Sequence, residues 1–418
     1  MSRWSLPMTD SPPTREARSL QSRTNYRLLL VGQFVSQLGD RVAMVAFPWL
    51  VYSATHSALS TGAVLALFTL PYVLFGAIAG GVLDRLDRRA VMVAADIVRG
   101  GLVLAVPYVA THSIAGVYAL AFATSCATVF FDPGLMALLP DIVPGDELLR
   151  ANSILSASEH VTEVVGYAAA GFVLFYVSTH TAFTIDAVTF GVSAVTLLAI
   201  TLDKRTHEGD PADAGEPEGH PSFRDQLREG IAYLAHHAGL RANTILAVTA
   251  VAGVGAFYPL TFLLAARQFH GPRSFGFMEA AIGLGYIVGS LAVTAGAKRV
   301  RKGLAITLGL MVMGVCYALP WMLGSLPLVL ADFVVLGAAN AVMLISIDTY
   351  VQSVVPDHLR GRVWGARFTL TQGVYAMGVL AAGGLAAVVS LGPLFGICGA
   401  IVFVPALIGF FVPVVRDV

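Results

Sequence analysis

Charged side chains are scarce in this sequence. They make up 12% of its 418 residues, against about 25% in a typical soluble protein. Acidic and basic residues number 26 each, so the formal net charge is zero and nothing indicates a nucleic acid as a partner. The three cysteines, Cys126, Cys316 and Cys398, all lie within apolar runs and show no metal-ligand spacing. We therefore expect neither a disulfide nor a metal site.

Sequence motifs of enzymes are also missing. The chain has no Gly-x-x-x-x-Gly-Lys-Ser/Thr phosphate loop, no His-Glu-x-x-His zinc motif and no stretch that reads as a soluble catalytic domain. We expect no enzymatic activity and no cofactor. Residues 1–26 are polar and lack the apolar core of a signal peptide, so we interpret them as a mostly disordered cytoplasmic tail.

Apolar residues, in contrast, are abundant. They make up 56% of the chain, and the mean hydropathy is +0.74. Runs of about 20 apolar residues have the length at which a helix crosses a bilayer. We predict an all-α membrane protein with twelve transmembrane helices, surrounded by the lipid bilayer. The predicted spans are residues 27–52, 58–83, 90–111, 113–138, 152–177, 180–202, 243–266, 275–297, 303–323, 326–350, 364–389 and 392–414.

The connections between the spans predict the orientation of the chain. Alternate connections are rich in arginine and lysine, whereas most of the others contain neither. Because basic loops remain in the cytoplasm, we expect both termini there, in a multi-pass protein of the bacterial inner membrane. One outward connection breaks this pattern, since it carries Arg267 and Arg273.

One long connection, residues 203–242, divides the chain. It begins as a flexible acidic linker and continues as an amphipathic helix, which we expect on the membrane surface or on the bundle. Phe47-Pro48 in the first span and Tyr258-Pro259 in the seventh occupy corresponding positions. We therefore predict two pseudo-symmetric six-helix bundles with a binding site near mid-membrane at their interface. The predicted bundles comprise residues 27–202 and 243–418.

Polar residues in the first span form a stripe. An ionisable group facing lipid costs at least about 2.5–3.5 kcal/mol at a helix centre, so such residues mark the protein interior. Gln33, Gln37 and Asp40 are spaced four and three apart on one helix face. We interpret this face as a cavity wall in which Asp40 binds a proton or a cationic substrate. The alternative is that Asp40 forms an ion pair, with Arg41 or another helix, that only stabilises packing.

The fifth span carries an ionisable cluster. Glu159, Glu163 and Tyr167 share a helix face, and His160 lies beside them. Tyr167 is a candidate for the wall of the substrate cavity. Two carboxylates four residues apart repel each other when both are ionised, so we expect one to hold a proton near neutral pH, as a proton carrier requires. His160 is a candidate to share that proton. The alternative is a hydrogen-bonded packing network.

Other spans contain further polar residues. Asp96 and Arg99 have the spacing of a local ion pair, with either a structural role or a part in coupling the cytoplasmic gate to the cavity. Asp186 and Asp332 lie near outer span ends, where they act either as helix-terminal acids or in coupling. Candidates for the second half of the cavity are Asn340, Thr371, Gln372 and Arg367, the last of which belongs alternatively to the cytoplasmic rim.

The turn between the second and third spans resembles a known signature. In the major facilitator superfamily this turn reads Gly-x-x-x-Asp-Arg-x-Gly-Arg-Lys. Asp87 here replaces the usual glycine, which allows a tight turn, and aspartate tolerates left-handed backbone better than most residues. The positions that fit the signature are Gly80, Asp84, Arg85, Arg88 and Arg89.

Three more stretches resemble the drug:proton antiporter branch of that superfamily, which contains macrolide efflux proteins and siderophore exporters. They are Gly39-Asp40-Arg41 leading to Phe47-Pro48-Trp49-Leu50-Val51, Leu139-Pro140-Asp141 with Ala151-Asn152-Ser153, and Leu359-Arg360-Gly361-Arg362-Val363.

The resemblance implies a cytoplasmic gate closed by charge contacts. Asp84 is then expected to contact the start of the eleventh helix. Arg88 is expected to pair with an acid near the end of the fourth helix, either Asp132 or Asp141. The expected gate residues are Gly80, Asp84, Arg85, Arg88, Arg89, Asp96, Arg99, Asp141 and Arg362.

The function that we predict is proton-coupled export of amphipathic small molecules, such as drugs or siderophores, by alternating access. Protons would neutralise Asp40 or the pair of Glu159 and Glu163, and we expect the protein to act as a monomer. The alternatives are proton-coupled uptake, movement of lipid between leaflets, or a transport-inactive receptor or scaffold with the same fold.

Overall fold

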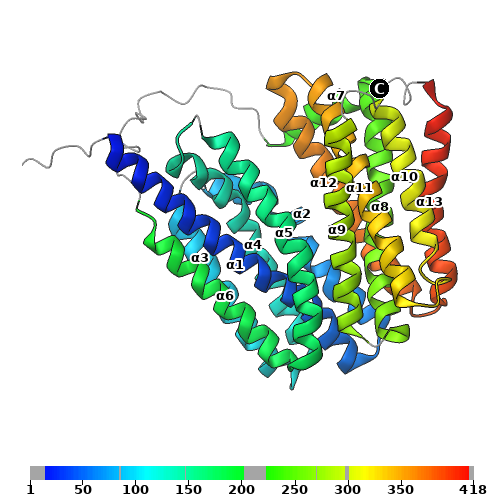
Figure 1. Cartoon of the computed structure of the whole chain (residues 1–418), viewed down its shortest axis with the longest axis horizontal. Coiled ribbons are helices and arrows are strands. Elements are labelled where there is room, and N and C mark those ends of the chain that lie inside the picture. The colour runs from blue at the N-terminus through cyan, green and yellow to red at the C-terminus, as the bar shows by residue number, and fades with distance from the viewer. Residues whose placement is uncertain are drawn as a thin grey trace, which may run out of the picture.

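The chain folds as a bundle of α-helices in the computed structural model (Figure 1). The structure describes residues 15–83, 86–145, 147–201, 223–269, 271–296 and 301–413, and these form thirteen helices and no strand. The helices are α1 (Arg15–Thr55), α2 (Ala58–Leu83), α3 (Arg88–Ala110), α4 (Ile114–Ile142), α5 (Leu148–Tyr176), α6 (Thr179–Ala199), α7 (Phe223–His236), α8 (Ala238–Gln268), α9 (Pro272–Gly296), α10 (Lys302–Ala318), α11 (Leu326–Val354), α12 (Asp357–Leu385) and α13 (Leu391–Phe411).

Two groups of six helices pack in the same pattern. In the first group, α1 packs against α5 and α6, α3 packs against α4 and α6, and α2 packs against α4. In the second group, α8 packs against α12 and α13, α10 packs against α11 and α13, and α9 packs against α11. Each pairing recurs seven helices later, as expected for two bundles related by pseudo-two-fold symmetry. The predicted fold class is confirmed.

Each of the twelve predicted spans overlaps a different helix, and α7 is the helix that no predicted span overlaps. Of the thirteen described helices, ten are long and apolar enough to cross a bilayer. Two further helices match predicted spans but are not among the ten: α10 has only 17 residues, and α5 carries the charged residues Glu159 and Glu163. The chain is therefore a multi-pass membrane protein. Several helices run beyond the predicted limits, because an apolar run locates the bilayer core but not the turns that project from it.

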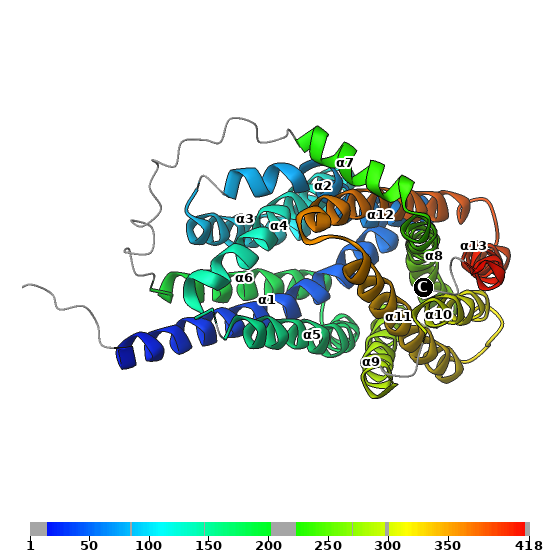
Figure 2. The ribbon, with the colours of Figure 1, turned by 90° about the horizontal axis from the view of Figure 1, so that it is seen from above.

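The amphipathic helix predicted in the long connection is α7, and it lies on the second bundle. Figure 2 shows α7 running beside α12. Glu229 of α7 pairs with Arg362 of α12. The contact is close, since a Cβ atom on Gly230 would lie 2.4 Å from the carbonyl oxygen of Arg362. Leu234 is buried in the same cluster as Val363.

The first helix begins earlier than predicted. Residues 15–26, which we expected within a mostly disordered tail, belong to α1. The amide of Asn25 donates to the carbonyl oxygen of Thr201 at 2.8 Å, and the hydroxyl of Tyr26 donates to that of Ala151 at 2.9 Å. These contacts hold the early turns of α1 against the ends of other helices, which a search for apolar runs does not detect.

The two bundles meet along α2 with α12 and along α5 with α9. Figure 1 shows them leaning apart towards the end that carries α7, which we call the α7 end. They touch near the opposite end, where a Cβ atom on Gly62 would lie 2.8 Å from the Cα atom of Gly383. Nearby, the ring centroids of Trp49 and Phe262 are 6.4 Å apart. The opposite end is therefore the closed end in this conformation.

The turn between α2 and α3 shows what Asp87 does in place of glycine. Its backbone has φ −62° and ψ 109°, so it does not use the left-handed region that favours glycine. Its carboxylate accepts a hydrogen bond from the backbone N–H of Ala90 at 2.9 Å and so caps α3. Asp84 and Arg85, two residues of the predicted gate, lie outside the described residues.

Replacing Asp87 with alanine should lower the free energy of unfolding by about 1 kcal/mol, whereas glycine should cost only a few tenths. Alanine leaves the first backbone N–H groups of α3 without their acceptor, while glycine lets water reach them. Chemical unfolding of the purified protein measures both. Equal losses for the two variants would contradict the capping role.

Candidate functional site

A cavity of about 460 Å³ lies within the first bundle, and all six helices α1–α6 contribute to its wall. All of its lining residues lie between positions 33 and 190, so the wall of this cavity belongs to the first bundle, and the binding site predicted at the interface between the bundles stays a prediction. Gln33 and Gln37 line it as part of the predicted stripe. Its apolar wall includes Met44, Phe47, Phe68, Phe131, Met136 and Phe190, and its acids are Asp40, Asp132, Glu159 and Asp186.

The three residues Gly39, Asp40 and Arg41 lie in one turn of α1, and each has different surroundings. Gly39 lies against α6, where a Cβ atom would be only 2.1 Å from Oγ1 of Thr189. Asp40 lines the cavity. Arg41 also lines the cavity, and its guanidinium lies 5.3 Å from the ring centroid of Tyr167. The close approach of α1 to α6, which needs glycine, thus brings Asp40 to the cavity wall.

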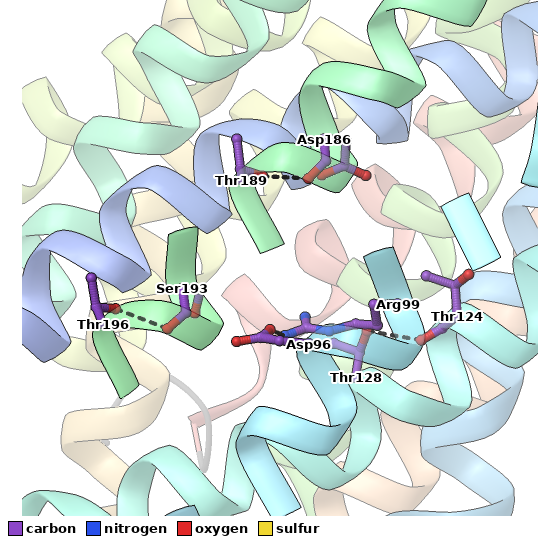
Figure 3. A network of polar contacts seen from close by, with 8 residues as sticks. All are labelled: Asp96, Arg99, Thr124, Thr128, Asp186, Thr189, Ser193 and Thr196. Carbon is purple, nitrogen blue, oxygen red and sulfur yellow. Dashed lines mark hydrogen bonds and ion pairs between the residues drawn. The ribbon is translucent and has the colours of Figure 1, made fainter. Parts of the chain in front are cut away.

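The ion pair predicted between Asp96 and Arg99 is present in α3, as Figure 3 shows. Asp96 is 0% exposed and Arg99 is 2% exposed. The guanidinium of Arg99 lies between two aromatic rings, 4.3 Å from the centroid of Phe131 and 4.4 Å from that of Phe190. The pair thus lies at the cavity wall, and its expected part in the cytoplasmic gate stays a prediction.

Four aspartates gather around this one arginine. Asp40, Asp132 and Asp186, from α1, α4 and α6, lie within electrostatic range of Arg99, in addition to its partner Asp96. Arg99 and Asp186 are buried, and Figure 3 shows Asp186 on the helix that faces the Arg99 ion pair. Arg41 is a second guanidinium within range of Asp40. Two guanidiniums balance two of the four carboxylates, so the cluster has acids left over to hold protons or to face a cation.

The ionisable residues of α5 face two different surroundings. Glu159 is exposed and lines the cavity. Glu163 instead faces His160, whose Nδ1 lies 3.5 Å from its carboxylate oxygen, and the ring of His160 packs on Tyr286 of α9 at 4.8 Å. Tyr167 is buried, and its hydroxyl contacts the sulfur of Met44. Proton sharing between Glu159 and Glu163 stays a prediction.

The candidates from the second bundle do not line this cavity. Asn340, Thr371 and Gln372 are absent from its wall, and the hydroxyl of Thr371 donates to a carbonyl of its own helix. Arg367 is buried rather than on the rim, and donates to the side chain of Asn243 at 2.8 Å. Asp332 is also absent from the cavity wall.

The candidates from the sequence did not include Tyr72, which lines the cavity, or Glu279, which lies outside its wall. Tyr72 donates a hydrogen bond to Asp132 at 2.9 Å on the cavity wall. Glu279 of α9 lies within electrostatic range of Arg41 and Glu163, which belong to the other bundle. Glu279 could have been selected from the sequence, because it is a carboxylate within a predicted span, as the other candidate acids are. Tyr72 could not, because its contact with Asp132 depends on how α2 and α4 pack.

The basic turn makes one of its expected contacts. Arg88 pairs with Asp141 at 3.0 Å, which identifies the acid among the two candidates. Arg89 donates instead to the carbonyl oxygen of Leu198, and Gly80 lies in α2. Both ion-pair partners belong to the first bundle, so this contact does not itself join the bundles.

The site and fold can now be compared with known proteins. The family model of the Major Facilitator Superfamily matches residues 29–379. The chain belongs to the Major Facilitator Superfamily. This match covers helices of both bundles and confirms the resemblance drawn from the basic turn. The chain is accordingly a membrane transporter by family.

Relatives of this chain include proteins named as efflux pumps. The multidrug efflux pump Tap of Mycobacterium tuberculosis (strain ATCC 25618 / H37Rv) is 27% identical over 401 residues, covering 93% of this chain and 94% of the relative. Macrolide efflux protein A of Streptococcus pyogenes is 23% identical over 372 residues, covering 86% and 88%. The predicted likeness to the drug-efflux branch is confirmed.

Solved structures share the fold. The nucleoside transporter NupG superposes with a TM-score of 0.74 at 13% identity, covering 92% of this chain and 98% of that one. A bacterial homologue of the iron transporter ferroportin in an inward-facing state superposes with a TM-score of 0.68 at 13% identity, covering 92% and 96%. At these identities the likeness concerns the fold alone.

Proposed function

We propose that this protein is a proton-coupled exporter of amphipathic small molecules in the bacterial inner membrane. The observation that carries the proposal is the cavity of the first bundle, where four acids face aromatic and methionine side chains. Its volume of about 460 Å³ falls in the range of about 300–1,000 Å³ typical of ligand pockets. The names of the relatives Tap and macrolide efflux protein A support a drug-like substrate.

Orientation follows from the charges on the connections. The basic residues Arg88, Arg89, Arg150 and Arg362 belong to turns or helix starts at the α7 end, and basic loops remain in the cytoplasm. The α7 end is therefore the cytoplasmic end, and both termini are cytoplasmic. Because the bundles meet at the opposite end, the conformation described here is an inward-facing one.

The transport cycle in this proposal is alternating access by a monomer. The two bundles, residues 27–202 and 243–418, rock about the contacts of α2 with α12 and α5 with α9, and residues 203–242 join them. In the outward-facing state, protons reach Asp40 and its neighbouring aspartates. Protonation neutralises these carboxylates and so weakens their attraction to a cationic or polar part of the substrate. The substrate then leaves and the protons are released inside.

Expression in a bacterial strain without its own efflux pumps tests this function. We expect raised tolerance to several amphipathic drugs, and loss of that tolerance when a protonophore removes the proton gradient. The matched control is the same strain with the empty vector. Increased drug sensitivity would instead indicate uptake, and no change over a broad panel would favour lipid movement or a transport-inactive protein.

A further inference from the structure

Arg273 is one of the two basic residues that the charge pattern leaves unexplained. It lies at the start of α9, in the connection that breaks the rule of basic residues on the cytoplasmic side. We propose that Arg273 closes the transporter at the opposite end, by a cation–π contact between the two bundles. This inference rests on the proposed alternating access and adds to it the residue that stabilises one of the two states.

The guanidinium of Arg273 is surrounded by aromatic rings. It lies 5.0 Å from the ring centroid of Phe172, 5.0 Å from that of Phe175 and 5.5 Å from that of Phe277. Cations within about 6 Å of an aromatic ring centroid are attracted to its face. Phe172 and Phe175 belong to α5 in the first bundle, and Arg273 and Phe277 belong to α9 in the second. We call these four residues the Arg273 clasp.

The backbones of the two bundles touch at the clasp. A Cβ atom on Gly171 of α5 would lie 2.8 Å from the carbonyl oxygen of Arg273, and one on Gly276 of α9 would lie 2.4 Å from the carbonyl oxygen of Tyr167. Only glycine at both positions permits this approach. The side chain of Arg273 is thus held against α5 by backbone packing as well as by the rings.

The contact exists in only one state of the proposed cycle. When the bundles separate at the opposite end, Arg273 leaves Phe172 and Phe175 and keeps only Phe277, which is on its own helix. A contact made in one of two states shifts the equilibrium towards that state. The ion pairs found among the described residues do not include Arg273, so the contacts of its guanidinium in this state are those with the three rings.

Arg267 supplies a matched control. It lies at the end of α8 in the same connection and carries the same charge, but it is exposed, and the cation–π contacts of the described residues do not include it. Removal of its charge changes the electrostatics of the connection without removing a contact between the bundles.

The test measures the opening of the opposite end in the full-length protein. Cysteines replace His112 and Met322, exposed residues in the α3–α4 and α10–α11 turns of the two bundles, after the three native cysteines are changed to alanine. Nitroxide labels on both positions then report the distance across this end in lipid nanodiscs by pulsed electron paramagnetic resonance. The measurement needs neither a substrate nor a proton gradient, so it is independent of the proposed drug export.

We expect Arg273→Ala to raise the ratio of the long-distance to the short-distance population about 10-fold, since the contact is partly desolvated, while Arg267→Ala leaves it unchanged. The double variant Phe172→Leu/Phe175→Leu should give the same shift, and adding Arg273→Ala to it should give no more. A distance distribution of Arg273→Ala equal to that of the parent, or an equal shift in Arg267→Ala, would overturn the proposal. If Arg273→Ala does not fold, the phenylalanine double variant decides alone.

Discussion

Asparagine in place of Asp40 should reduce proton-driven export to background while the protein still folds and inserts. Asparagine keeps the shape of the side chain but cannot take up or release a proton. Asp40 lines the cavity and lies within electrostatic range of Arg99, Arg41 and Asp186. Its loss therefore removes one of the acids that both line the cavity and belong to the cluster around Arg99.

The measurement compares two assays in proteoliposomes that contain the purified protein. Accumulation of a fluorescent drug driven by a pH gradient should be lost in Asp40→Asn, whereas exchange of labelled for unlabelled drug without a gradient should continue. Asp332→Asn is a matched control, because Asp332 is an acid in a helix of the second bundle and is absent from the cavity wall. A pH dependence in Asp40→Asn identical to that of the parent would reject Asp40 as the coupling acid.

Methionine in place of Arg99 should lower the free energy of unfolding by about 3–5 kcal/mol, because it leaves a buried carboxylate without its partner. Asp96 is 0% exposed and has Arg99 as its ion-pair partner. The variant also loses the stacking of the guanidinium between Phe131 and Phe190. We expect little folded protein after extraction in detergent, measured by size-exclusion chromatography and thermal unfolding.

A second substitution separates the charge effect from the loss of packing. The double variant Asp96→Asn/Arg99→Met has no unpaired charge at this position and should recover most of the lost stability. Asp96→Asn alone should cost less than Arg99→Met, because three further aspartates remain near the guanidinium. Full stability of Arg99→Met, or a double variant no more stable than Arg99→Met, would show that the ion pair does not stabilise the bundle.

Features that depend on local sequence were predicted well. The spans follow from apolar runs, and the pair of Asp96 and Arg99 follows from a spacing of three within one helix. The amphipathic pattern after residue 222 predicted α7. The family was visible in the turn that ends at Arg89 and in Gly39-Asp40-Arg41, because these residues lie close together in the chain.

Features that depend on contacts between helices were predicted less well. That all six helices of the first bundle line one cavity, with Asp40 in its wall, was not predicted. Glu279 was not selected, although it lies near Arg41 and Glu163. Arg273 was only an exception to the charge pattern. In each case the decisive partners are on other helices, so no spacing along one helix indicates them.

By itself, the sequence determined where the apolar helices lie and that they repeat in two halves, since hydrophobicity acts over short stretches of chain. The charges on the turns predict the side of the membrane that each turn prefers. Only the tertiary structure decided which acids surround Arg99 and which rings surround Arg273. Those contacts depend on the rotation of each helix about its own axis and on glycine-mediated approaches such as that of Gly171 to α9. Such packing is a property of the helices together, because most of these partners lie on other helices.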